Sequence, residues 1–283
     1  MNSQTTQTIL THEVLTQVNN ERAFFETFGQ KYPADPTVTV TETSIAGVKS
    51  YWFKPAVAKE NNIIIFLHGG GYTIGGIKSH KPMVSHFTAA LRTNVLFVEY
   101  SLAPEYPFPT ANNEILAVYK ELLQRYPGHH FSFIGDSAGG GLAVAATHAI
   151  AAEKLQSPAA VVLISPWLNL KANNASYQTR QALDPIFTRE IIAGYARLYA
   201  AGAVSLADPD ELEFGQFPPV SILAGTNEIL FDDAKNFYEK IKEVQPKAQF
   251  KEYKNQLHVW PLADINSDAS KEALRDIVAF MQD

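Results

Sequence analysis

The sequence predicts an α/β fold in which a mostly parallel β-sheet is covered on both faces by helices. Two observations predict it. Beyond residue 62, short β-branched or aromatic runs alternate with longer helical patterns, and strands joined through helices run parallel. The run Ile63-Ile64-Ile65-Phe66-Leu67 also lacks any polar position, as expected for a strand buried on both faces.

The chain before this strand predicts a helix followed by a hairpin. Residues 8–32 have helical periodicity, and Pro33 and Pro36 end the pattern. Alternating apolar positions at 38–40 and 48–53, around Ala46-Gly47, predict two antiparallel strands. The expected apolar contacts of the first helix are Ile9, Leu10, Val14, Val18, Phe24, Phe25 and Phe28.

The rest of the chain predicts the alternating part of the fold. The expected strands are 95–98, 131–134, 160–164, 220–223 and 249–253, and the expected helices are 81–92, 111–126, 139–153, 232–244 and 268–281. Residues 171–217 contain a helix at about 189–201 but no strand, so they form an insertion between two sheet strands, suited to a lid. We expect a single domain over residues 1–283.

Composition narrows the function. A formal net charge of −6, with scattered basic residues, argues against nucleic acid as a partner. The absence of cysteine excludes disulfides, thiolate catalysis and cysteine-ligated metals. The N-terminus is polar without a signal-peptide pattern, and no apolar run reaches the length of a membrane span. These features predict a soluble cytoplasmic protein.

A serine lies at the junction of a predicted strand and helix, in Gly135-Asp136-Ser137-Ala138-Gly139. In a nucleophile elbow, a strained turn projects the serine hydroxyl into a cavity. The residues two before and two after it crowd together, so both are glycine. The first amides of the following helix point toward the serine, where they can bind an oxyanion. This context predicts Ser137 as a nucleophile.

A second glycine-rich motif, His68-Gly69-Gly70-Gly71, follows the buried strand 63–67. Consecutive glycines let the backbone approach a tetrahedral intermediate and aim N–H groups at its oxygen. A glycine turn of no function is the alternative interpretation. Because the motif lies upstream of an elbow, at the end of the expected strand, we favour an oxyanion loop.

With these motifs the chain resembles the hormone-sensitive-lipase-like branch of the α/β-hydrolases, the bacterial family IV esterases, from about residue 23 to the end. The resemblance also rests on Tyr100-Ser-Leu-Ala-Pro-Glu-Tyr-Pro-Phe-Pro109 and Ser165-Pro-Trp-Leu168. It implies an eight-stranded sheet and a helical cap built from about residues 1–35 and 171–217. It also implies oxyanion donors at the amides of Gly70, Gly71 and Ala138, and hydrolysis of short-acyl carboxylic esters without a cofactor or metal.

A serine nucleophile of this fold needs an acid and then a histidine later in the chain. His258 is the histidine downstream of the acid candidates; His12, His80, His86 and His148 show no pattern that indicates a site. Three carboxylates, Glu228, Asp232 and Asp233, follow the strand 220–223. We favour Glu228, although most members of the resembling family have aspartate there, because the two aspartates suit the first turn of a helix.

Three departures from the resembling family are Ser101 in place of arginine, Asn169 in place of aspartate, and Glu228. An amidase or peptidase using the same triad, or a non-catalytic ligand-binding protein, remains as an alternative. A dinucleotide-binding fold is disfavoured because no complete G-x-G-x-x-G follows a strand. Homodimers occur in the resembling family, and the sequence leaves this open.

The short insertion suggests a small acyl group. Its apolar residues, with those of the first helix, either line an acyl pocket or pack the cap onto the body; they are Leu183, Ile186, Phe187, Tyr195, Leu198, Tyr199, Phe24, Phe25 and Phe28.

Overall fold

The computed structural model describes residues 11–282. Its strands are β1 Val38–Ile45, β2 Val48–Pro55, β3 Asn62–Leu67, β4 Asn94–Val98, β5 His130–Asp136, β6 Val161–Ile164, β7 Val220–Gly225 and β8 Gln249–Tyr253. Its helices are α1 His12–Glu26, η1 Thr27–Gln30, α2 Ile77–Leu91, α3 Thr110–Arg125, α4 Ala138–Ala152, α5 Ser176–Thr179, α6 Arg189–Ala200, α7 Val204–Ala207, η2 Pro209–Glu211, α8 Phe231–Ile241, α9 Trp260–Ala263 and α10 Asp268–Phe280.

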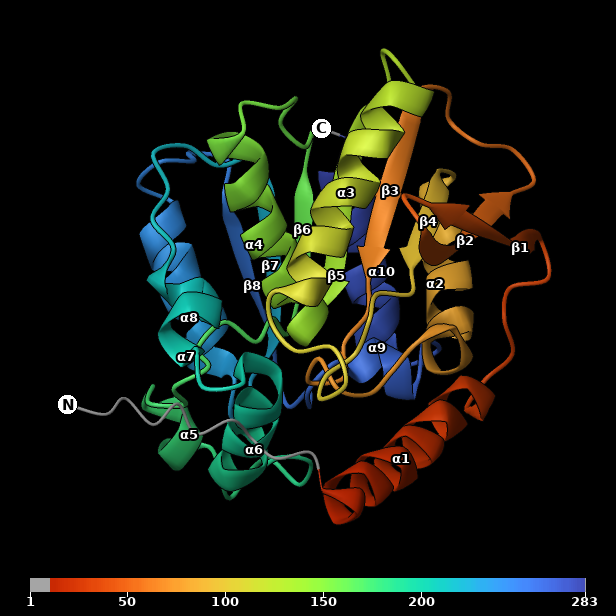
Figure 1. Ribbon diagram of the computed structural model, residues 1–283. Helices are drawn as coiled ribbons and strands as arrows, with labels where there is room; N and C mark the ends of the chain where they lie inside the picture. The colour runs from red at the N-terminus through yellow and green to blue at the C-terminus, as the bar shows by residue number, and fades with distance from the viewer. Residues whose placement is uncertain (1–10, 283) are drawn as a thin grey trace.

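The strands form one 8-stranded sheet in the order β1-β2-β4-β3-β5-β6-β7-β8 (Figure 1). β1 pairs antiparallel with β2, and β2 pairs antiparallel with β4. The pairs from β4 through β8 are all parallel. The predicted α/β-hydrolase architecture, a mostly parallel eight-stranded sheet flanked by helices, is confirmed.

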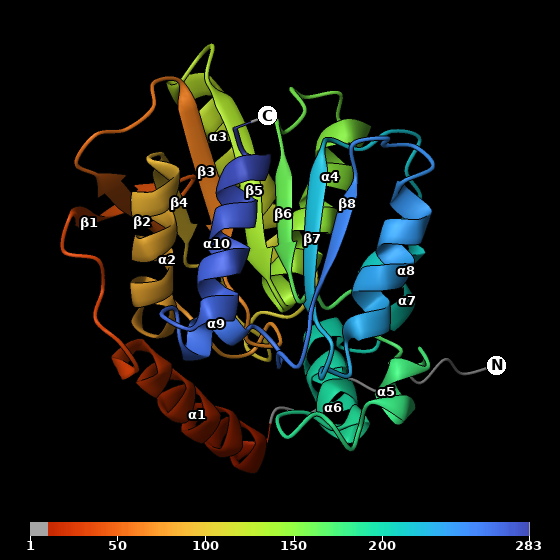
Figure 2. The same cartoon turned by 180° about the vertical axis from the view of Figure 1, so that it is seen from behind.

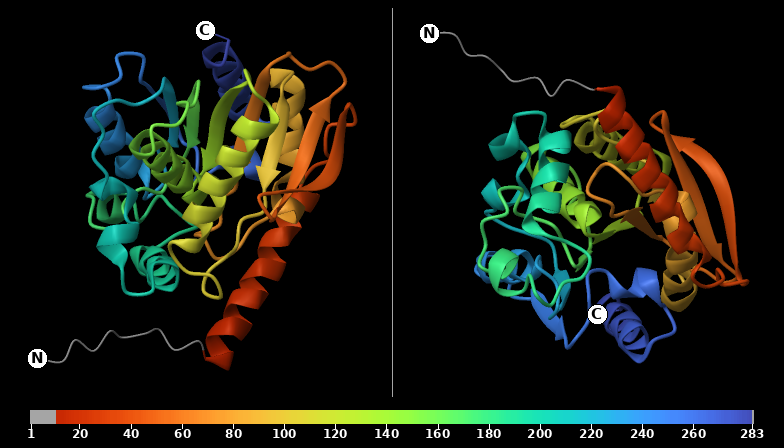
Figure 3. Two further views of the ribbon diagram at one scale, coloured as in Figure 1. Left: turned by 45° about the horizontal axis from the view of Figure 1, so that its top comes forward. Right: turned by 90° about the horizontal axis from the view of Figure 1, so that it is seen from below.

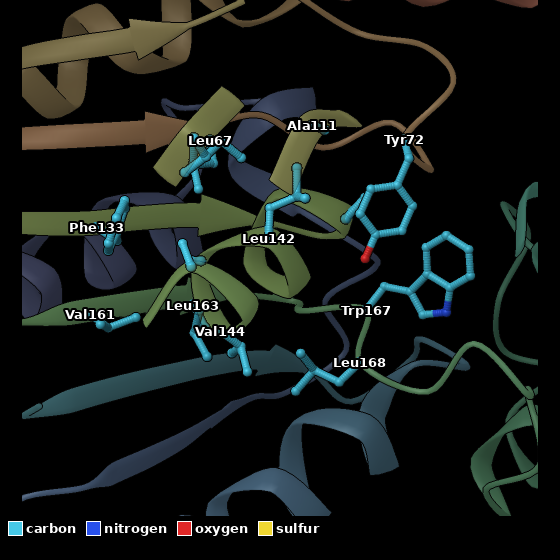
Figure 4. Close-up of a cluster of buried hydrophobic side chains, with 14 of the residues drawn as sticks. Leu67, Tyr72, Ala111, Phe133, Leu142, Val144, Val161, Leu163, Trp167 and Leu168 are labelled. Carbon is cyan, nitrogen blue, oxygen red and sulfur yellow. The ribbon is translucent and has the colours of Figure 1, made fainter. Parts of the chain in front are cut away.

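Each strand of the parallel part of the sheet contributes apolar side chains to two separate hydrophobic cores, one on each face of the sheet. In β3, Ile63, Ile65 and Leu67 join the core beneath α3, α4 and α8, whereas Ile64 and Phe66 join the core beneath α2 and α10. Figure 2 shows α2 and α10 on one face, and Figure 4 shows part of the cluster on the other. Burial on both faces explains why this strand has a continuous apolar sequence instead of an alternating one.

The N-terminal helix and the insertion lie beyond the carboxyl ends of the parallel strands (Figure 3). Arg22 anchors α1 to the loops that follow β3 and β4. Its guanidinium donates to both carboxylate oxygens of Glu105 and to the carbonyls of Thr73 and Ala103. Tyr195 of α6 donates to Glu21 of α1 at 3.1 Å, so the two segments also contact each other. The arrangement encloses the end of the sheet where ligands bind in α/β folds.

Two helical predictions need correction. The helix predicted at 81–92 begins at Ile77, because the Glu99 carboxylate accepts the Ile77 amide and so satisfies the first turn. The N-terminal helix ends at Glu26 and continues as a 3₁₀ turn, and its expected contacts Ile9 and Leu10 lie outside the described residues. Phe24, an expected apolar contact, is 68% exposed.

Candidate active site

Ser137 occupies the sharp turn between β5 and α4. Its φ of 51° and ψ of −121° are unusual for a residue with a side chain, and its neighbours must be small to permit the turn. A Cβ atom added to Gly135 would lie 2.4 Å from the carbonyl oxygen of Gly139. This is the crowding that the sequence pattern implied. The hydroxyl of Ser137 faces the cavity described below.

Two distant loops bring His258 and Glu228 to this serine. The distance from His258 Nε2 to Ser137 Oγ is 2.8 Å, and that from His258 Nδ1 to Glu228 Oε2 is 2.7 Å. Glu228 is fully buried, and its Oε1 accepts the Gly225 amide at 2.7 Å. Since a carboxylate only accepts hydrogen bonds, we assign the ring proton to Nδ1, which leaves Nε2 free to accept the serine proton.

The other two acid candidates are bound elsewhere. Asp232 Oδ2 accepts the amide of Ser176. Asp233 is buried and accepts the amides of Leu168 and Asn169 and the hydroxyl of Tyr177. Both lie in the first turn of α8, as expected. Burial raises the pKa of Asp233 to about 7. These carboxylates hold the loop after β6 and the insertion against α8.

The glycine loop after β3 lies beside the serine. Gly70 and Gly71 line the same cavity as Ser137 and His258, and both have positive φ, 121° and 58°. Within residues 11–282, the amides of Gly70, Gly71 and Ala138 donate to no protein oxygen, which leaves them available to a ligand. A Cβ atom on Gly71 would lie 2.8 Å from Cγ of Tyr195, so the cap packs directly on this loop.

His68 shapes the loop without facing the substrate. Its Nδ1 lies 2.8 Å from the Gly69 carbonyl oxygen, its own carbonyl accepts the Tyr100 hydroxyl at 2.7 Å, and its ring stacks on Tyr100. Burial lowers the pKa of His68 to about 3, so the ring is neutral. The neutral ring therefore holds the loop by stacking on Tyr100 and by the hydrogen bond that its Nδ1 donates to the Gly69 carbonyl.

The cavity over these residues has a volume of about 560 Å³. Such a volume suits a small organic ligand. The cap residues Ile186, Phe187 and Tyr195 line it, as do the N-terminal aromatics. Leu183, Leu198 and Tyr199 do not; the ring of Tyr199 stacks on Tyr72 at 3.7 Å instead. Part of the expected apolar set thus lines the cavity, Tyr199 packs within the protein, and Leu183 is 50% exposed.

The sequence analysis missed Asp184 of the insertion, a largely buried residue. Its carboxylate accepts the amides of Ile186, at 2.8 Å, and Ile229, at 2.9 Å. Ile229 adjoins Glu228, and the nearby Phe187 ring packs edge-on to His258 at 5.1 Å. This carboxylate therefore joins the cap to the loop that carries the acid. No sequence pattern marks this role, because Ile229, the partner next to the acid, lies 45 residues away.

The fold and the elbow define an α/β hydrolase. A family profile described as "alpha/beta hydrolase fold" matches residues 64–262. The chain is 30% identical over 256 residues to an esterase of Acinetobacter venetianus, covering 88% of this chain and 84% of the relative. It is 35% identical to an acetyl-hydrolase of Streptomyces hygroscopicus over 213 residues, which cover 74% of this chain and 71% of that one.

Among solved structures, an esterase of the bacterial hormone-sensitive lipase family superposes with a TM-score of 0.90 at 32% identity, covering 94% of this chain and 91% of that one. The chain belongs to this hormone-sensitive-lipase-like family of α/β hydrolases and is a carboxylic ester hydrolase. None of the helices in residues 11–282 combines the length and apolar character needed to cross a membrane.

Proposed function

We propose that the protein is a serine carboxylesterase for short-acyl esters, with Ser137 as nucleophile, His258 as base and Glu228 as the orienting acid. The observation that carries the proposal is the pair of hydrogen bonds, of 2.8 and 2.7 Å, that joins the three side chains in that order. This order is that of a nucleophile activated by a base, which is in turn oriented by an acid.

The reaction proceeds in two steps. His258 Nε2 takes the proton of Ser137 as its oxygen attacks the ester carbonyl carbon, and the amides of Gly70, Gly71 and Ala138 stabilise the oxyanion. The tetrahedral intermediate collapses, the C–O bond to the alcohol breaks, and His258 returns the proton to the leaving alcohol. Water then attacks the acyl-enzyme by the same path and releases the acid.

Glu228 holds the imidazole in the tautomer that accepts the serine proton and stabilises the imidazolium that forms. Its complete burial strengthens this interaction, because little water screens the pair. The single hydrogen bond from the Gly225 amide fixes the other carboxylate oxygen.

We place the cap of this enzyme in the N-terminal segment up to about residue 35, of which the structure describes residues 11–35, and in the insertion at about 171–217, within one domain. The cavity of about 560 Å³ must hold both the acyl and the alcohol parts of the ester, and we take this as support for a preference for short acyl groups. The similarity to an acetyl-hydrolase supports the same preference.

The proposal is tested by hydrolysis of p-nitrophenyl esters from acetate to dodecanoate, with the Ser137→Ala variant assayed beside the native protein. We expect turnover that is highest for the short esters and is lost in the variant. Turnover that rises toward dodecanoate would refute the short-acyl preference. No turnover by a folded protein would refute the esterase proposal and direct attention to amide substrates and then to ligand binding.

A further inference from the structure

A buried carboxylate lies directly beside the proposed nucleophile. Asp136, the residue before Ser137, is 1% exposed and contributes to the lining of the cavity. A Cβ atom placed on Gly69 would lie 2.3 Å from Asp136 Oδ2 and 3.0 Å from Ser137 Cβ. The carboxylate therefore packs against the residue that precedes the first proposed oxyanion donor, Gly70. A bare negative charge at this place would oppose the oxyanion that forms during ester hydrolysis.

Little in the surroundings offsets this charge. Three nearby titratable side chains, His68, Tyr32 and Tyr100, all remain neutral, because burial lowers the pKa of His68 to about 3 and raises the pKa of both tyrosines. Within residues 11–282, Asp136 Oδ1 accepts no hydrogen bond. The other oxygen, Oδ2, faces Nε2 of His80 at 3.4 Å.

The hydrogen bonds around His80 fit a doubly protonated ring. His80 lies in the first turns of α2 and is fully buried. Its Nδ1 lies 2.8 Å from the hydroxyl oxygen of Ser79, and that hydroxyl donates its one proton to the Gly76 carbonyl at 3.0 Å. Because that proton is used, Nδ1 of His80 donates to the oxygen of Ser79, while Nε2 donates to Asp136. We assign a proton to each ring nitrogen on the basis of these contacts, which gives the ring a positive charge.

We propose that His80 is a positioning residue whose positive charge offsets Asp136, so that the oxyanion beside Gly70 does not face an uncompensated carboxylate. The pair also ties α2 to the elbow, since Asp136 ends β5. Oxyanion stabilisation depends on fixed charges and dipoles near the site, and a buried charge acts there with little screening. The inference rests on the proposed esterase function.

The test uses the variants His80→Gln, Asp136→Asn and the double variant, each checked for folding by thermal melting. We expect His80→Gln to lower kcat for p-nitrophenyl acetate by roughly tenfold to a hundredfold, with a smaller effect on KM, because it leaves the carboxylate unpaired. Adding Asp136→Asn to it should restore most of the lost kcat. His86→Gln, in the same helix but facing Asp35, is the matched control and should leave kcat unchanged.

The affinity for a phenylboronic acid tests the same charge effect without turnover. The adduct that it forms with Ser137 is tetrahedral and negatively charged, like the oxyanion intermediate. Binding should weaken in His80→Gln and recover in the double variant. A double variant with losses equal to or greater than those of His80→Gln would overturn the inference, and so would a folded His80→Gln with native kcat.

If His80→Gln does not fold, the test uses kcat of the double variant. A value below roughly a tenth of the native kcat would overturn the charge argument, and a higher value would support it. A native protein that is inactive on every ester would instead refute the proposed function, which separates the two failures.

Discussion

Ser137 shows how one residue combines backbone strain with chemistry. Its positive φ is tolerated because the glycines around it allow the turn and because its carbonyl accepts the amides of Gly140 and Trp167. The motif and its position between a strand and a helix predicted this serine, and chain order predicted His258. Among three carboxylates within six residues of one another, the sequence favoured Glu228 because the two aspartates suit the first turn of a helix. The contacts of the three carboxylates agree with that choice.

Substituting Glu228 by glutamine is the residue-scale test of the acid. Glutamine keeps the size of the side chain but removes the charge that fixes the His258 tautomer, so kcat should fall by about 10³–10⁴-fold. Asp232→Asn is the matched control, since that carboxylate accepts the Ser176 amide instead. Steady-state kinetics on p-nitrophenyl acetate compares the two variants. A larger loss of kcat in Asp232→Asn than in Glu228→Gln would identify Asp232 as the acid instead.

At the scale of elements, the predictions succeed where burial determines the sequence and fail where long-range contacts determine the boundary. The buried run of β3 was predicted because burial on both faces demands apolar residues throughout. The start of α2 was missed because Glu99, 22 residues away, caps it. His80 was missed for the same reason, since its partner Asp136 lies 56 residues further on.

The link between the cap and the acid loop should depend on Asp184. Asp184→Ala leaves the buried amide of Ile229 without an acceptor, so we expect a loss of about 1–3 kcal/mol in unfolding free energy. The loop carrying Glu228 also loses its anchor, so kcat should fall by roughly tenfold. Urea denaturation and ester kinetics measure both. Asp35→Ala, which removes a local turn with Thr37, serves as the control.

Equal effects of Asp184→Ala and Asp35→Ala on kcat would contradict a role of the cap in positioning the acid. The sharper variant Asp184→Asn keeps one acceptor oxygen and should lie between the native protein and the alanine variant in both measurements.

For the whole molecule, His68 couples stability to pH. Its pKa is near 3 in the folded protein and about 6.5 when unfolded, so the unfolded chain binds more protons between these values. Its contribution is complete above about pH 6.5 and is lost as the pH falls toward 3. Asp233 and Asp208, whose pKa values burial raises to about 7 and about 6, act in the opposite direction.

A comparison with His68→Gln isolates this contribution. Between about pH 7 and about pH 4.5, the unfolding free energy of the native protein should fall more steeply on acidification than that of the variant. Urea denaturation at several pH values measures the difference. Two curves that stay parallel over this range would show that His68 does not titrate on unfolding as its burial requires.

The order of the strands could not be derived from local patterns at all. Periodicity identifies β3, β4 and β5, but β3 lies between β4 and β5, and that placement depends on how the crossover helices pack. The cavity likewise exists only because α1 and α6, 163 residues apart between Glu26 and Arg189, meet at one end of the sheet. The resemblance to a family implied the eight-stranded sheet and the two-part cap, but it did not give the strand order, and neither did composition and spacing.

The most direct test of the central claim is covalent labelling of the serine. The protein is incubated with a p-nitrophenyl phosphonate ester, and the labelled peptide is identified by mass spectrometry. We expect one phosphonyl group per chain on Ser137, with none on the Ser137→Ala variant and a much slower reaction in His258→Ala. An adduct on another residue, or an active esterase that takes up no label at Ser137, would contradict the account.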